Sequence, residues 1–339
     1  MSIEERQCAA DVLMIRPVRY AANPQTAASN RFQVPLSHDQ GDPRRDGPIH
    51  SGEAATTRLL EVESQQKRVQ AAACFEFDAL AAALRLAGVR VHVFDDTAQP
   101  HTPDSIFPNN WVSFHADGTV VLYPMLAENR RLERRQDVLE SLSAQQGFRV
   151  ERIVDLTHHE RQGRFLEGTG SLVLDRVHRI AYACLSARTN LDVLGDFAQQ
   201  LDYEIVAFEA RDAHGMPVYH TNVMMSVGSR VAAICAASIR EDERAAVLDT
   251  LRATGHEILD LSIEQLTEFP GNMLALSTSR GESIVAMSQR ALGSLSAEQR
   301  AMLETHGGSI VACAVPTIEA LGGGSVRCML AEIHLPRKN

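Results

Sequence analysis

One stretch of the sequence decides the fold: residues 165–208, FLEGTGSLVLDRVHRIAYACLSARTNLDVLGDFAQQLDYEIVAF. It opens with an apolar strand, turns at 175–179 and continues into a second apolar strand, IAYACL, at 180–185. Apolar residues then recur at three- and four-residue spacing through 187–201, which predicts a helix, and YEIVAF at 203–208 predicts a third strand. The stretch is therefore one strand–strand–helix–strand unit.

The same unit is used about five times along the chain. Its opening strands begin at residues 107, 165, 219, 269 and 323, which lie 58, 54, 50 and 54 residues apart. A fixed period of this size is typical of arrays and propellers. The fifth unit lacks its second half, which the N-terminal region can supply.

The N-terminal region offers a strand at 11–17, a helix at about 53–88 and a strand at 89–94. Circular completion of this kind favours a closed ring, which also protects strand edges. We therefore expect one catalytic domain over 1–339, an α/β propeller of five pseudo-symmetric units closed by the N- and C-terminal segments. The polar segment 23–52, rich in Gly, Pro, Asn and Asp, predicts a long loop that is either disordered or a lid over a site.

Composition narrows the classes of partner. The chain has 339 residues, of which 45% are hydrophobic, and a formal net charge of -10. Its densest basic run, 129–135, is interrupted by Glu133 and predicts a solvated helical face rather than a nucleic-acid interface. The N-terminus fits neither a signal peptide nor a membrane span, so we expect a cytoplasmic protein with a small-molecule substrate. The oligomeric state is left open, with a homo-oligomer allowed.

Neither a metal nor a cofactor is expected. The six cysteines form no CxxC pair, so they indicate neither a disulfide framework nor a zinc site. The run His158-His159-Glu160 lacks HExxH spacing and predicts a loop, and the glycines at 322–324 are not followed by the Lys-Ser/Thr of a phosphate loop.

The repeat predicts where the site lies. Equivalent positions of a ring converge on its axis, so the polar residues that open each unit should face one another. These residues are Asn109, Asn110, Glu167, His220, Asn222, Asn272 and Cys328.

Three of these residues form a catalytic set. A cysteine thiolate is a strong nucleophile, but it needs a group that takes its proton and later protonates the leaving group. Histidine exchanges protons near neutral pH, and a carboxylate on its other ring nitrogen fixes its orientation. Cys328, His220 and Glu167 supply these parts. Any one of them alone would more often be an ordinary core residue, whereas three at equivalent repeat positions favour catalysis.

The motifs VLMIRP (12–17), NPQTAASN (23–30), FPNNW (107–111), HTNVMMS (220–226) and GGGSVRCML (322–330) resemble the guanidine-modifying superfamily. That superfamily includes arginine deiminases, dimethylarginine dimethylaminohydrolases, agmatine deiminases, amidinotransferases and ureido-hydrolases. The resemblance covers nearly the whole chain and comes nearest to the citrulline hydrolase branch. It implies a five-unit α/β propeller, Cys328 as nucleophile, His220 as general acid and base, and Glu167 as its partner.

The resemblance also implies a substrate-binding set. Asp104 in PDSIFPNN is similar to the residue that holds the α-amino group. Arg131 and Arg188 resemble the pair that holds the α-carboxylate, with Arg130 an alternative to Arg131. Asn23, in the loop at 23–52, is expected to reach the substrate.

Amides stand where relatives with a guanidinium substrate place carboxylates. A guanidinium is permanently charged and donates five hydrogen bonds, so it is costly to bury unpaired. Asn109, Asn110 and Asn222 suit a neutral ureido group instead, which favours citrulline over arginine.

Other activities stay open at this stage. Arginine dihydrolases and deiminases also fit the pattern, dimethylarginine fits less well, and an amidinotransferase would resolve the same adduct with an amine instead of water. A non-catalytic binding protein on the same fold would not require the Cys–His–Glu set.

Overall fold

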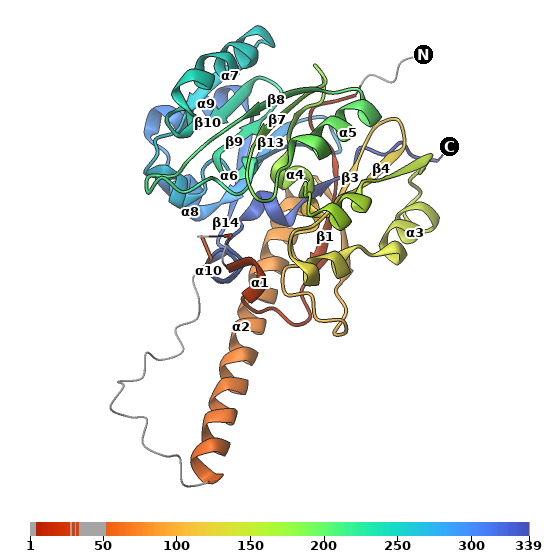
Figure 1. Ribbon diagram of the computed structural model, residues 1–339, viewed down its shortest axis with the longest axis vertical. Coiled ribbons are helices and arrows are strands. Elements are labelled where there is room, and N and C mark those ends of the chain that lie inside the picture. The colour runs from red at the N-terminus through yellow and green to blue at the C-terminus, as the bar shows by residue number, and fades with distance from the viewer. Residues whose placement is uncertain (1–4, 28, 31, 34–51, 339) are drawn as a thin grey trace.

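The computed structural model describes residues 5–27, 29, 30, 32, 33 and 52–338, and for residues 52–60 only the backbone (Figure 1). Within this part of the chain, strands form five sheets of three strands each. Four sheets follow one another along the chain: β3 (Val112–Phe114), β4 (Thr119–Leu122) and β5 (Arg152–Asp155); β6 (Val173–Asp175), β7 (Ile180–Cys184) and β8 (Glu204–Phe208); β9 (Met225–Val227), β10 (Val231–Ile234) and β11 (Glu257–Asp260); β12 (Leu274–Ser277), β13 (Ser283–Ser288) and β14 (Ser309–Cys313).

All four sheets have the same topology. The first strand pairs antiparallel with the middle strand, and the middle strand pairs parallel with the third. A parallel step needs a crossover, and a helix supplies it each time. These helices are α3 (Gln136–Ala144), α5 (Leu191–Leu201), α7 (Glu241–Ala253) and α9 (Ala297–His306). The strand–strand–helix–strand unit predicted from residues 165–208 is thus confirmed.

The fifth sheet joins the two ends of the chain. β15 (Ala331–Glu332) pairs antiparallel with β1 (Asp11–Arg16), and β1 pairs parallel with β2 (Arg90–Asp95), so the topology is again that of the other sheets. The crossover is α2 (Gly52–Leu86), two residues shorter at its end than the predicted helix. In Figure 1, α2 extends well beyond the body of the protein.

Apolar spacing explains how the helices pack. Helix α5 begins at the N-cap Asn190, whose side chain accepts a hydrogen bond from the backbone N–H of Asp192. It buries Val193, Phe197 and Leu201, which its 3.6-residue period places on one face. In Figure 1, α3, α5, α7 and α9 lie at the periphery, and the strands lie inside them.

One predicted helix is broken. The apolar spacing over 129–147 predicts a continuous helix, but the structure forms η2 (Glu128–Glu133), an extended link, and then α3. Arg134 and Arg135 are the extended residues of this link. The side chain of Arg134 donates to the carbonyl of Tyr123 and to Glu160, so this extended residue is tied to two other segments.

Short helical turns precede the first strand of most units, where sequence pattern predicts strand alone. They are η1 (Pro108–Asn110), α4 (Gly168–Ser171), α6 (Thr221–Met224) and η6 (Val326–Met329). The remaining helical segments are α1 (Pro24–Ala27), η3 (Thr157–Gln162), η4 (Ala236–Ser238), η5 (Gln265–Glu268), α8 (Gln289–Ser294) and α10 (Pro316–Gly322). None of the described helices has the length and apolar content required to cross a membrane.

A buried ion network ties both ends of the chain to the second unit. Arg176, 2% exposed, donates to Glu5 at 2.9 Å and lies 3.8 Å from Glu332. Glu332 also pairs with Arg327 at 3.2 Å. Because these groups are away from water, each charge depends on its partners for compensation.

Removing Arg176 should therefore destabilise the fold strongly. We expect Arg176→Ala to lower the free energy of unfolding by about 3–5 kcal/mol, because the buried carboxylates of Glu5 and Glu332 each lose one of their cationic partners. Chemical denaturation measures this. As a control, Arg149→Ala removes an exposed pair with Glu151 and should cost at most about 1 kcal/mol. Equal losses in the two variants would contradict the importance of burial.

Candidate active site

The polar residues that open the five units lie next to one another. Thr169 donates through Oγ1 to the carbonyl of Asn109 at 3.3 Å, which links the first unit to the second. Asn222 Nδ2 donates to the carbonyl of Thr169 at 3.2 Å, and Asn272 Nδ2 donates to that of Asn222 at 2.9 Å. Asn272 Nδ2 also lies 3.2 Å from Cys328 Sγ, and η6 contacts η1. The structure thus brings the predicted residues together from segments that are far apart in sequence.

The sulfur of Cys328 lies among amides. The residue is 3% exposed and lies in η6. Its Sγ faces Nδ2 of Asn272 at 3.2 Å and Nδ2 of Asn222 at 3.6 Å. Both amides can donate to a sulfur that carries negative charge, which is the reactive form of a cysteine.

His220 and Glu167 form a buried hydrogen-bonded pair. His220 is the N-cap residue of α6, and Glu167 is the N-cap residue of α4, so each side chain is placed by the turn that follows it. His220 Nε2 lies 2.8 Å from Glu167 Oε2. Oε1 of Glu167 accepts from the backbone N–H of Leu126 at 3.1 Å. Glu167 is therefore held at both oxygens.

The surroundings set the charges of this pair. Burial alone would raise the pKa of Glu167, but Arg188, His220 and Arg130 outweigh it and hold that pKa well below its ordinary value. Burial lowers the pKa of His220 to about 4, against the opposing effect of Glu167. Near neutral pH, Glu167 is thus charged and His220 is neutral. Because a carboxylate only accepts, the proton of the neutral imidazole lies on Nε2, and Nδ1 is left as a base.

Two glycines make room for this arrangement. Gly168 has φ +45°, and a Cβ there would collide with the carbonyl oxygen of Asn109. A Cβ on Gly170 would lie 2.8 Å from Nδ1 of His220 and would also collide with the amide of Asn110. The motif FLEGTG therefore contains both Glu167 and the two glycines, which the close approach of Asn109, Asn110 and His220 requires.

The amides of the first unit carry buried polar atoms that lack partners within the described residues. Both side-chain atoms of Asn109 and Nδ2 of Asn110 are in this state. Oδ1 of Asn110 accepts from Arg130 Nη1 at 2.9 Å. Buried polar groups are usually paired, so these atoms suggest a place where a polar ligand would bind.

Arg130, not Arg131, is directed into the site. Arg130 is 2% exposed and donates to both oxygens of Glu133 at 2.9 Å, while burial raises the pKa of Glu133 to about 8. Arg131 donates to the carbonyl of Met125 and lies 3.6 Å from Glu160. In a 3₁₀ helix consecutive side chains point about 120° apart, so neighbouring arginines of η2 cannot share one direction. For the α-carboxylate ligand, the geometry therefore favours the alternative, Arg130, over Arg131.

Arg188 lies between the catalytic carboxylate and the N-terminal segment. Its Nη1 donates to Glu167 Oε2 at 3.2 Å, and its Nη2 donates to Ser29 Oγ at 2.7 Å. Its guanidinium lies over the ring of Tyr219, 5.1 Å from the centroid. Tyr219 also contacts the ring of His220 at 4.7 Å. Sequence reasoning missed Tyr219, although its position beside His220 could have suggested it.

Asp104 and Asn23 also meet. Asn23 is fully buried and donates through Nδ2 to Asp104 Oδ2 at 2.7 Å. Thr26 Oγ1 lies 3.3 Å from the same oxygen, whereas Oδ1 of Asp104 has no partner among the described residues. Asp104 thus keeps one oxygen for a further donor.

Residues 23–33, where described, lie over the site. Asn30 Nδ2 donates to the carbonyls of Gly322 and Gly323 at 3.1 and 3.3 Å. The ring of Phe32 packs between Tyr219 and Phe269, at centroid distances of 5.9 and 5.1 Å. The lid over 23–52 stays a prediction, and its part over 34–51 falls outside the described residues.

Comparisons with known proteins agree with this fold. A family model described as N,N dimethylarginine dimethylhydrolase, eukaryotic, matches residues 52–335. A comparison with curated protein sequences finds no match.

Several solved structures are similar. The substrate-bound N-terminal domain of ArgZ, an arginine dihydrolase of the ornithine–ammonia cycle in Cyanobacteria, aligns with TM-score 0.65 and 17% identity over 96% of this chain and 99% of that chain. AgrE with L-arginine gives 0.67 and 16% over 97% of this chain and 41% of that one. A dimethylarginine dimethylaminohydrolase carrying an S-methyl-L-thiocitrulline adduct gives 0.59 and 14% over 96% and 100%. The chain spans 41% of full-length ArgZ. At these identities the likeness shows the fold.

The low pKa of His220 predicts a dependence of stability on pH. The unfolded histidine titrates near its ordinary value of 6.5, whereas the folded one titrates at about 4. Between these values the unfolded state binds more protons, so stability falls as the pH is lowered. One proton over this window corresponds to about 3 kcal/mol. Denaturation of wild type and His220→Gln from pH 7 to 4 should show a steeper loss for wild type; parallel curves would refute the assignment.

Proposed function

The chain belongs to the family of the eukaryotic N,N dimethylarginine dimethylhydrolases, and from that premise we propose that it is a cysteine hydrolase of ureido or guanidino amino acids, with citrulline as substrate. The family acts on carbon–nitrogen bonds. The observation that carries the proposal is the placement of Cys328 Sγ against two amide donors in the same buried cluster as the neutral His220 and the charged Glu167.

The charges around the site support a neutral substrate. Two carboxylates near the amides are already engaged, Glu167 with His220 and Arg188 and Glu133 with Arg130. Oδ1 of Asp104, which has no partner among the described residues, is assigned below to the amino-acid end of the substrate. A guanidinium would have to share one of these carboxylates. The amide of Asn109, with a donor and an acceptor both unpartnered among the described residues, matches a ureido group, which has a carbonyl oxygen and N–H donors.

In the proposed reaction, Nδ1 of His220 takes the thiol proton as the sulfur of Cys328 attacks the ureido carbon. The imidazolium, stabilised by Glu167, protonates the departing nitrogen, and ammonia leaves. The remaining adduct joins sulfur to a carbonyl that still carries the ornithine nitrogen. His220 then removes a proton from water, which attacks this carbonyl; the sulfur departs, and the carbamate releases CO2 to give ornithine.

We assign the α-amino and α-carboxylate groups of the substrate to Asp104, Arg188 and Arg130. Oδ1 of Asp104, unpartnered among the described residues, would accept from the α-amino group. Arg188 and Arg130 supply guanidinium groups for the α-carboxylate, a pairing that suits fork geometry. For Arg188 to do so, its hydrogen bonds with Ser29 must be exchanged for substrate contacts. Asn23 donates to the other oxygen of Asp104, Oδ2, and so positions this carboxylate.

Dimethylarginine is the second candidate substrate, because the matching family model carries that activity in its description. Arginine is a third, since ArgZ is an arginine dihydrolase of the same fold. An amidinotransferase reaction would use the same adduct but require an amine acceptor.

Four features of the organisation also stand as proposals. They are a single domain over 1–339, closure of the five units into a ring, the lack of a cofactor in the reaction, and a cytoplasmic location. Ring closure is supported by the contacts that run from one unit opening to the next and by the pairing of β15 with β1.

A product assay tests the function. We expect the purified chain to convert citrulline to ornithine and ammonia without added amine, and Cys328→Ser to reduce kcat by a factor on the order of 10³ or more. Cys74→Ser, which changes a thiol on α2, is the matched control and should keep full activity. Citrulline that accumulates from arginine would indicate a deiminase, dimethylamine release would indicate the second candidate, and full activity of Cys328→Ser would refute the mechanism.

A second variant tests the preference for a neutral group. Asn109→Asp keeps the shape of the side chain but adds a negative charge that favours a cationic head group. We expect kcat/KM for citrulline to fall and the ratio of arginine to citrulline turnover to rise by about tenfold or more, since charged hydrogen bonds are worth about 1.5–3 kcal/mol. Steady-state kinetics with both substrates measures this ratio. An unchanged ratio would mean that Asn109 does not face the reacting group.

A further inference from the structure

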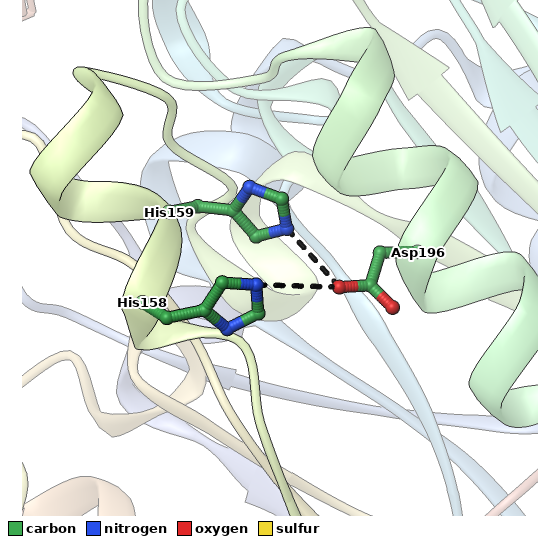
Figure 2. A group of neighbouring side chains, drawn as sticks. All are labelled: His158, His159 and Asp196. Carbon is green, nitrogen blue, oxygen red and sulfur yellow. Dashed lines mark hydrogen bonds and ion pairs between the residues drawn. The ribbon is translucent and has the colours of Figure 1, made fainter.

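A second cluster of chemically reactive side chains lies away from the catalytic residues. His158 and His159 belong to η3, and Asp196 belongs to α5 (Figure 2). Asp196 Oδ2 lies 3.1 Å from Nε2 of His159 and 3.7 Å from Nε2 of His158. Figure 2 shows both imidazoles presenting this nitrogen to the same carboxylate oxygen.

The hydrogen bonding of His158 makes this arrangement unusual. Its Nδ1 lies 3.2 Å from the carbonyl oxygen of Asp155. A carbonyl only accepts, so the proton of a neutral imidazole must lie on Nδ1, which leaves a lone pair on Nε2. That lone pair then faces a carboxylate oxygen, which is also an acceptor. Nε2 and the carboxylate oxygen are therefore two donor atoms that a cation between them would join.

The spacing of the three atoms fits a metal ion. They all lie within 4.8 Å of one another. A tetrahedral ion with ligands at about 2.0–2.1 Å separates its donor atoms by roughly 3.3 Å. The two imidazole nitrogens lie 3.1 and 3.7 Å from Asp196 Oδ2. The rings of His158 and His159 pack against each other at a centroid distance of 4.2 Å. The Asp155 carbonyl acts as the outer partner that commonly orients a ligating histidine.

We propose that His158, His159 and Asp196 bind one divalent ion of the zinc type, with Nε2, Nε2 and Oδ2 as ligands and a fourth position open to solvent. Two imidazoles and one carboxylate suit zinc and its neighbours in the first transition series, whereas magnesium and calcium prefer oxygen ligands alone. The side chain of His158 is 53% exposed, which gives the ion a path of entry.

The sequence predicts no metal here because the consecutive run His158-His159-Glu160 lacks the spacing of a metal motif. The third ligand lies 37 residues beyond His159 and reaches it through the packing of α5. Glu160 points elsewhere and pairs with Arg134 at 2.6 Å.

The ion would join η3 to α5. The chain that leaves η3 runs directly into the strand opening that carries Glu167, so a metal clamp here would steady the approach to the catalytic carboxylate. Arg131 lines the same surface pocket as His158, and Glu160 offsets its charge at 3.6 Å. The expected effect is therefore on stability and metal content.

Cobalt(II) is the probe for the test, because its spectrum distinguishes ligand types. The full-length chain, stripped of metal with a chelator, should bind one equivalent of Co²⁺ and show visible bands without a thiolate charge-transfer band. His158→Gln and Asp196→Asn should each weaken binding by tenfold or more, since even an outer partner of a ligand is worth 10–100-fold. Zn²⁺ should raise the Tm of wild type and leave that of Asp196→Asn unchanged.

Two controls make the test specific. Asp192→Asn changes an exposed acid of the same helix that pairs with Arg164, and it should bind Co²⁺ as wild type does. Cys328→Ser should also retain binding, which excludes the nucleophile as the ligand. The proposal is overturned if wild type binds no more tightly than Asp196→Asn or if a thiolate band appears.

Discussion

The buried charge of Glu167 is the constraint on which the site depends. A carboxylate without access to water is stable only if charges and donors surround it. Here those groups come from different parts of the chain: the imidazole of His220, the guanidinium groups of Arg188 and Arg130, and the backbone of Leu126. Satisfying one anion thus draws several units together. The same anion also holds the imidazole of His220 through a hydrogen bond of 2.8 Å.

Much of the architecture could be predicted from the sequence because the unit is repeated. A single strand–strand–helix–strand pattern is ambiguous, but five copies at nearly constant spacing support the same interpretation. All five sheets have the topology that this unit predicts. The same symmetry also predicts that the polar residues at the start of each unit lie close together.

What the sequence could not predict depends on tertiary contacts. The break before α3 lies at Arg134, whose side chain bonds to Tyr123 and Glu160 in other segments. The turn of η2 decides which of two adjacent arginines faces the site. Asp196 joins the pair of histidines only after α5 packs beside η3. In each case the deciding partner lies in another element, beyond the reach of local periodicity.

The pairing of β15 with β1 has a consequence for how the chain may be rearranged. Because the last strand of the fold lies beside the first, a short linker could join the two ends, and new ends could be opened elsewhere. The exposed hairpin turn at 279–282, between β12 and β13, is a suitable place to cut. Such a circular permutant would contain the same sheets in a different chain order, with its termini moved to another unit.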